Sequence, residues 1–179
     1  MINKTNNQEY VSKLKKTYST LAQATNLIIA EEGIPQADKG GWATTSENVY
    51  NLYKKFLHNA KECGINSGCF VQPIYTLNKD SSRIWDSSNY YRRFVLADGV
   101  QVLLTYPTAD CSLYDSYCDE IYVDINGERK PNTLGLDVFL FYLTNKGLVP
   151  SGCETNDCSR SQGGWFCACK VLREGAINY

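Results

Sequence analysis

The side chains best suited to chemistry in this sequence are oxygen-bearing groups around a glycine turn. Asp124 and Asn126 precede Gly127, and Asn132 and Asp137 follow it. Alternating carboxylate and amide oxygens around such a turn can bind a hard cation such as Ca²⁺, although the spacing is not that of an EF-hand. The alternative is structural: Asn126-Gly127 reverses the chain, and Asp137 caps or hydrogen-bonds the backbone. Both interpretations place these four residues in one late loop.

The sequence offers few residues for catalysis. His58 is the single histidine and falls in a predicted helix, so a Cys–His or Ser–His pair has little support. A loop contains several serines, none in a nucleophile-elbow pattern: Ser81, Ser82, Ser87 and Ser88. The pairs Gly40-Gly41 and Gly163-Gly164 do not lead from a strand into a helix, so they predict no phosphate site. We therefore expect no enzymatic activity.

Eight cysteines lie in segments rich in Gly, Ser, Asn and Asp. An even number in this setting is typical of a disulfide-bonded extracytoplasmic domain, and reduced, buried cysteines are the alternative. Closeness in sequence predicts the pairs Cys63–Cys69 and Cys111–Cys118. The remaining four are expected to bond with one another in an order that the sequence leaves open: Cys153 and Cys158 with Cys167 and Cys169.

Composition narrows the class of protein further. The 179 residues suffice for a hydrophobic core. Eighteen basic residues nearly balance nineteen acidic ones, so no overall field attracts nucleic acid or anionic lipid. No apolar run approaches the ~20 residues that span a bilayer. These features favour one extracytoplasmic domain, 1–179.

Two helices are predicted in the first third of the chain. The first helix is predicted over about 5–33, and Gly33 and Pro35 end it. Its apolar residues recur at helical spacing: Val11, Leu14, Tyr18, Leu21 and Ile28. Thr44 and Glu47 form a capping-box pattern that begins a second helix over about 45–62.

The region 63–179 is predicted to hold a sheet and disulfide loops. Asp98-Gly99 between two apolar runs is a strong hairpin signal. The expected strands are 70–77, 90–97, 100–106, 120–125 and 137–143, followed by a closing hairpin of 165–172 and 176–179. Helices followed by strands with tight turns predict an α+β fold with an antiparallel sheet.

Three stretches resemble the type IV pilin and type II secretion pseudopilin family. The first, 14–24, is similar to the helix that follows the membrane segment of prepilin-type proteins. The second is Tyr122-Val123-Asp124-Ile125-Asn126-Gly127 with 131–139, which is similar to the late sheet segment. The third, 165–175 with Tyr179, is similar to the closing hairpin. Together they span most of the chain in the family's order.

The resemblance implies a long N-terminal helix packed on an antiparallel sheet, preceded by an apolar helix that this sequence does not contain. It implies a non-catalytic filament subunit, anchored in the inner membrane through that absent helix before assembly. The expected partners are copies of itself, other pilins or pseudopilins and the inner-membrane assembly machinery, and no nucleic acid. Some family members bind calcium in a late loop, which extends to Asp124, Asn126, Asn132 and Asp137. No other cofactor is implied.

A secreted binding module or adhesin is the second hypothesis. Aromatic side chains that remain exposed can stack on sugars or contact a partner protein. The candidates are the three tryptophans and two neighbouring tyrosines: Trp42, Trp85, Trp165, Tyr90 and Tyr91.

Overall fold

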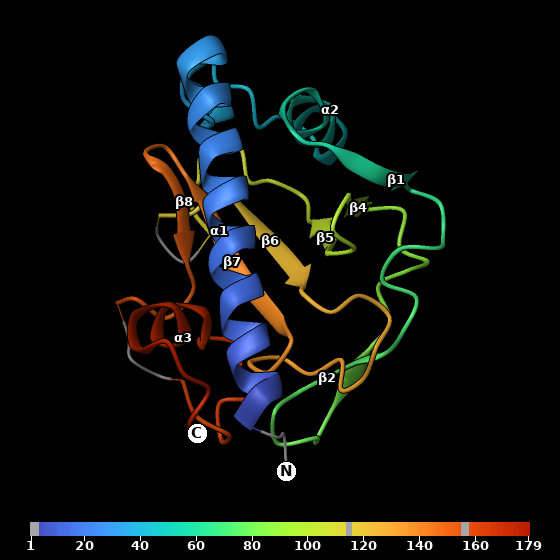
Figure 1. The fold of residues 1–179 in the computed structure, drawn as a ribbon. Coiled ribbons are helices and arrows are strands. Elements are labelled where there is room, and N and C mark those ends of the chain that lie inside the picture. Colours follow the sequence, from blue (N-terminus) through green and yellow to red (C-terminus); the bar gives the residue numbers. More distant parts are fainter. Residues whose placement is uncertain (1–3, 114–115, 155–157) are drawn as a thin grey trace.

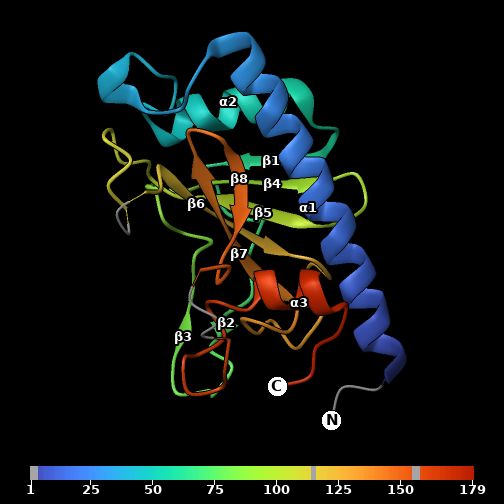
Figure 2. The ribbon, with the colours of Figure 1, turned by 90° about the vertical axis from the view of Figure 1, so that its left-hand side faces the viewer.

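The computed structural model describes residues 4–113, 116–154 and 158–179. The fold is α+β: a long N-terminal helix crosses one face of an antiparallel sheet, and four disulfides crosslink the loops (Figures 1 and 2). The helices are α1 (Lys4–Glu32), α2 (Ser46–Phe56), α3 (Ala168–Glu174) and a short 3-10 turn, Ala37–Lys39. The strands are β1 (Asn59–Gly64), β2 (Ile74–Tyr75), β3 (Ser82–Arg83), β4 (Arg92–Leu96), β5 (Gln101–Leu104), β6 (Asp119–Asp124), β7 (Val138–Thr144) and β8 (Gly147–Pro150).

The main sheet has the strand order β1-β4-β5-β6-β7-β8, and all of its pairs are antiparallel. The predicted hairpin at Asp98-Gly99 joins β4 to β5, and Gly99 has a φ of 85°, a conformation that glycine adopts freely. β6 and β7 pair from Asp119↔Leu143 to Asp124↔Val138. This register brings the end of β6 next to the start of β7 and so positions the loop that carries Asp124 and Asp137.

α1 matches the helix expected over 5–33. Its apolar stripe is buried, with Leu14, Leu21 and Ile28 fully covered, while Ser12, Lys15 and Ser19 on the other side are exposed. The helix contacts α2, β8 and α3 along its length. One face of α1 therefore forms part of the core, and the opposite face lies on the molecular surface.

The sheet separates two hydrophobic clusters, because successive side chains of a strand point to opposite faces. Ile121, Val123 and Phe141 face α1 and α2. Tyr122 and Tyr142 face the other side, where the loops between β1 and β4 and near the C-terminus cover them. Both faces are thus buried over the centre of the sheet.

The second helix is shorter than predicted. It begins after Thr45, whose side chain accepts a hydrogen bond from Asn48 N at 3.1 Å, and it ends at Phe56 rather than 62. The end of the predicted helix, 59–62, instead belongs to β1, which pairs with β4. Hydrogen bonds with β4 at the edge of the sheet outweigh the helix propensity of Ala60, Lys61 and Glu62 in this segment.

Two other predicted elements also differ. Within 70–77 only Ile74–Tyr75 is a strand, and it pairs with β3 in a small separate sheet. The hairpin expected over 165–172 and 176–179 is wrong, because the chain forms α3 there and leaves it at Gly175, which has a φ of 66°. β8 was not predicted; it forms a hairpin with β7.

Candidate functional site

The loop between β6 and β7 brings together the four residues predicted as a cation site. Asp124 is the last residue of β6, and Asp137 directly precedes β7. All four side chains are buried, with exposed fractions of 1% for Asp124, 7% for Asn126, 3% for Asn132 and 0% for Asp137. Such a density of buried polar groups requires partners, because an unpaired buried polar group is costly.

Asp137 holds the loop in place through three N–H donors. Its Oδ1 accepts a hydrogen bond from Thr133 N at 2.6 Å, and its Oδ2 accepts from Asn132 N at 2.8 Å and from Asn126 Nδ2 at 2.9 Å. These bonds are the structural role that the sequence offered as the alternative to cation binding. Burial is the main influence on the carboxyl and raises its pKa to about 6, although the three donors act in the opposite direction.

Asp124 is the second buried carboxyl of this loop. Its Oδ1 accepts a hydrogen bond from Asn126 N at 3.1 Å. Burial and then the nearby charge of Asp137 raise the pKa of Asp124 well above its ordinary value. Two carboxyl groups in one buried cluster repel each other when both are ionised, so a proton or a cation between them stabilises the loop.

Two amide oxygens of the cluster lack hydrogen-bond donors. They are Asn126 Oδ1 and Asn132 Oδ1, both fully buried. The orientation of the Asn126 amide is fixed because its Nδ2 donates to Tyr10 Oη at 3.0 Å and to Asp137. Carboxylate and unpaired amide oxygens are the ligand types that Ca²⁺ prefers, so the donor set fits a hard cation. Within the described ranges, neither this loop nor any other part gathers three His, Cys, Asp or Glu side chains, so the two amide oxygens would have to complete the ligand set.

The bond between Asn126 and Tyr10 also ties the loop to α1. Tyr10 lies in the second turn of the helix and is 8% exposed. Arg129 of the same loop reaches Glu9 of α1, with an N–O distance of 3.7 Å. The geometry of the β6–β7 loop therefore bears directly on how the first turns of α1 are held.

The eight cysteines form four disulfides. Cys63–Cys69 and Cys111–Cys118 are the pairs expected from sequence proximity, and the structure completes the set with Cys153–Cys169 and Cys158–Cys167. Four disulfides indicate an oxidising environment.

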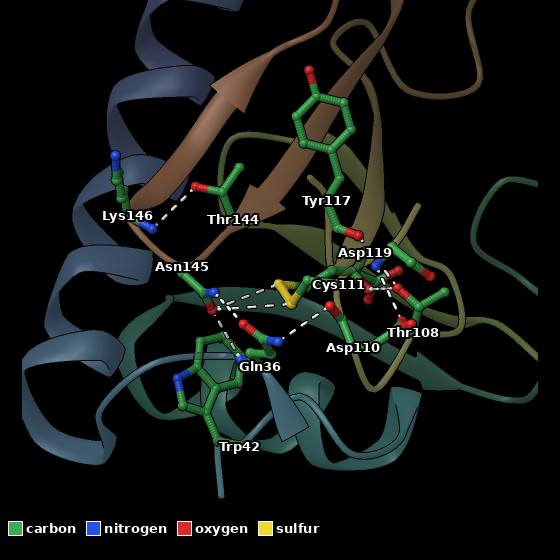
Figure 3. Close-up of a disulfide and its surroundings, with 12 residues drawn as sticks. Gln36, Trp42, Thr108, Asp110, Cys111, Tyr117, Asp119, Thr144, Asn145 and Lys146 are labelled. Carbon is green, nitrogen blue, oxygen red and sulfur yellow. Dashed lines mark hydrogen bonds between the residues drawn. A yellow bond between two sulfur atoms is a disulfide. The ribbon is translucent and has the colours of Figure 1, made fainter. Parts of the chain in front are cut away.

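Figure 3 shows the surroundings of the Cys111–Cys118 bond. The Oδ1 of Asn145 accepts from Gln36 N at 3.1 Å, and its Nδ2 donates to Gln36 Oε1 at 2.7 Å. Gln36 Nε2 in turn donates to Asp110 O at 3.2 Å. This network joins the segment after α1, the disulfide loop and the β7–β8 turn.

A further buried carboxyl, Asp119 at the start of β6, was missed by sequence reasoning. It is 0% exposed, and its Oδ1 accepts from Thr105 Oγ1 at 2.5 Å while its Oδ2 has no partner. Burial raises the pKa of Asp119 to about 7. Its place in an alternating strand pattern, in step with the buried Ile121 and Val123, was a signal that the side chain points inward.

The residues considered for catalysis or ligand stacking are scattered. His58 is exposed between α2 and β1, and Ser82 lies in β3, so they form no pair. Trp42 and Trp85 are 6% exposed, which leaves only Trp165 of the three partly accessible. Trp165 borders a groove of about 310 Å³ together with Glu120 and Arg83, whose guanidinium lies 5.3 Å from the indole ring centroid.

Comparison with known proteins gives no family for this chain: no family model, no curated protein and no solved structure matches it. In the described part of the chain, no helix combines the length and the apolar character needed to cross a bilayer.

Proposed function

We propose that this chain is the extracytoplasmic head of a filament subunit of the type IV pilin or type II secretion pseudopilin type. The observation that carries the proposal is the placement of α1. The helix has 29 residues, about 43 Å at 1.5 Å per residue, and lies across one face of the sheet. Its first turn lies at the periphery of the molecule, at the end marked N in Figures 1 and 2.

This placement suits an upstream extension of the helix. A continuation of α1 along its axis would leave the body of the molecule instead of running into the sheet (Figure 2). In the proposal an apolar helix precedes residue 1, anchors the subunit in the inner membrane and then packs with copies of itself in the filament. The disulfide-bonded domain then forms the outer surface of the filament, where its disulfides resist unfolding and proteolysis.

The exposed side of α1 supports contacts between subunits. Leu27 is 52% exposed near the C-terminal end of the helix, and Ile34, just beyond it, is 39% exposed. In a filament of identical subunits the contacts are heterologous, so a rotation that does not close produces open helical growth.

The first test is the gene upstream of residue 1. An apolar segment of about 20 residues is expected there. A protein expressed with that segment should fractionate with the membrane and appear in sheared surface filaments when the assembly machinery is present. A variant with the upstream segment deleted should remain a monomer in analytical ultracentrifugation. A gene that encodes no apolar segment before residue 1 contradicts the proposal.

We further propose that the β6–β7 loop holds one Ca²⁺, with Asp124 and Asp137 as carboxylate ligands and the amide oxygens of Asn126 and Asn132 as neutral ones. The support is the pair of unpaired buried amide oxygens beside two carboxyls. A bound cation would supply charge that offsets the repulsion between the carboxylates and would rigidify the loop that contacts Tyr10.

A second candidate function, a secreted module that binds a glycan, is favoured by one observation: the groove beside Trp165 combines an indole, a guanidinium and a carboxylate. These groups can stack on a sugar ring and bind its hydroxyls. A glycan array is the direct test. Hits that disappear in Trp165→Ala would favour this candidate, and an array without hits would remove it.

A further inference from the structure

A second pocket lies at the end of the molecule where α1 begins. Its volume is about 560 Å³, and its walls come from β2 with the turn after it and from the β6–β7 loop. β2 and the N-terminal end of α1 both lie at the lower end in Figures 1 and 2. The residues used in the argument below are Tyr75, Lys79 and Lys130, all of which line the pocket.

The two walls are bound to each other through the backbone. Tyr75 N donates to Asn132 O at 2.9 Å, and Leu134 N donates to Tyr75 O at 2.9 Å. In the turn after β2, Lys79 N donates a hydrogen bond to Thr76 O at 2.9 Å. The other wall is held by Asp137, which accepts hydrogen bonds from Asn132 N and Thr133 N. The pocket is therefore a preformed feature of the fold.

Among the described residues, two lysines and no carboxylate line the pocket. Lys79 and Lys130 are both exposed, and neither takes part in an ion pair among residues 4–113, 116–154 and 158–179. The neighbouring acidic residue Asp80 accepts a hydrogen bond from Asn78 Nδ2 at 2.9 Å. Although the whole chain is close to neutral, two ammonium groups beside one cavity attract an anion locally.

The exposed side chain of Tyr75 is of a type that favours a membrane–water interface. Its side chain is 41% exposed. Tyrosine is enriched at membrane–water interfaces because its ring is amphipathic, and basic residues near an anionic leaflet are attracted to phosphate groups. Tyrosine and lysine together are thus the side chains that a headgroup region favours.

We propose that this pocket binds the phosphodiester headgroup of an anionic phospholipid. The inference rests on the proposed function, in which an apolar helix upstream of residue 1 brings the N-terminal end of α1, and the pocket with it, against the bilayer. Lys79 and Lys130 bind the phosphate oxygens, and Tyr75 lies at the headgroup level. The contact would orient the head on the membrane before the subunit enters a filament.

The test uses the chain of residues 1–179 and vesicles at low ionic strength. Co-sedimentation is measured with vesicles of phosphatidylglycerol and phosphatidylcholine and with vesicles of phosphatidylcholine alone. Binding is expected only to the anionic vesicles. The double variant Lys79→Ala/Lys130→Ala should bind at least tenfold more weakly, since each basic residue near the surface contributes to attraction.

The matched control is Lys39→Ala/Lys146→Ala. These lysines are also exposed, take part in no ion pair among the described residues and lie at the opposite end of the molecule, near the contacts of Gln36 and Asn145. The control has the same net charge as the test variant and should bind like the unmodified chain. The double variant Lys79→Arg/Lys130→Arg should retain binding. Equal loss of vesicle binding in the test and control variants would overturn the proposal, because net charge alone would then explain the binding.

Soluble glycerol phosphate separates the two sources of the same phosphate chemistry. Titration followed by amide NMR should shift resonances around Tyr75 and Lys130 weakly, while vesicles bind more strongly. Saturable binding of the soluble anion without any vesicle binding would overturn the assignment to lipid. Failure of vesicle binding leaves the filament proposal intact, because that proposal is tested through the upstream segment and filament recovery.

Discussion

The Nδ2 of Asn126 donates a hydrogen bond to Oδ2 of Asp137 at 2.9 Å across the loop between β6 and β7. The same amide group also donates to Tyr10 Oη at 3.0 Å, so one asparagine side chain connects the sheet, the loop and the long helix. Two residues 116 positions apart in sequence are thereby joined at a buried site. The loop is for this reason a structural junction as well as a candidate cation site.

Replacement of Asp137 should test the structural role of the loop. Asp137→Ala removes the acceptor of three N–H groups and leaves buried donors unpaired. The free energy of unfolding should fall by about 3 kcal/mol, measured by urea denaturation with disulfides intact. Glu128→Ala, at an exposed position of the same loop, should change it by less than about 0.5 kcal/mol. Equal effects of the two substitutions would contradict this role.

Calcium should stabilise the protein if the two buried carboxylates are its ligands. Metal is first removed with EDTA, and 1 mM CaCl₂ is then added in excess. The melting temperature should rise by about 5 °C or more, because a ligand present well above its Kd stabilises the folded state. Asp124→Asn should abolish the shift. Asp80→Asn, at an exposed position, should preserve it. Identical melting curves with calcium and with EDTA would reject the cation site.

The stability should depend on pH through Asp119. The pKa of this carboxyl is about 7 when folded and about 4 in an unfolded chain, so the folded state binds the proton more tightly. The stabilisation is therefore complete below pH ~4 and is lost as the pH rises through 7. The raised pKa values of Glu120, Asp124 and Asp137 act in the same direction, and the lowered one of the more exposed Asp98 opposes them.

We expect the free energy of unfolding, measured in EDTA, to fall by about 4 kcal/mol between pH 5 and pH 8, with the largest share from Asp119. Asp119→Asn removes the ionisable group, so the variant should show a weaker pH dependence and be more stable than the unmodified chain at pH 8. Asp80→Asn should follow the unmodified chain. A variant of Asp119 with an unchanged pH profile would show that this carboxyl does not titrate in the range.

The sequence predicted the elements whose signals are local. The apolar stripe of α1 and the Asp98-Gly99 turn depend on residues close in sequence, and both were found where expected. The four loop residues were also brought together, because β6 and β7 are adjacent antiparallel strands. The two short-range disulfides followed from proximity in the same way.

The errors occurred where distant contacts decide the conformation. Asn59–Gly64 contains good helix formers, but β4 supplies the hydrogen bonds that make it a strand. The segment of α3 was read as a strand, although Ala168, Val171 and Leu172 have helical spacing and Gly175 is a typical C-terminal residue. Asp119 was not singled out from the sequence, and its burial depends on the pairing of β6 with β7, where it lies opposite Leu143.

The pairing of the last four cysteines gives a covalent test of the C-terminal fold. Cys169 lies in α3 and its N donates to Ser151 O at 3.0 Å, which brings it to Cys153, while Cys167 precedes the helix and reaches Cys158. Peptide mapping under non-reducing conditions should recover peptides joined by Cys153–Cys169 and by Cys158–Cys167.

Removal of Cys153–Cys169 as a double alanine variant should cost about 3 kcal/mol of unfolding free energy, because 16 residues separate the two cysteines. The matched variant without Cys63–Cys69, where the separation is 6, should lose about 2 kcal/mol. Recovery of Cys153–Cys167 or Cys158–Cys169 would contradict this arrangement, in which Cys169 in α3 and Cys167 just before it bond to different partners.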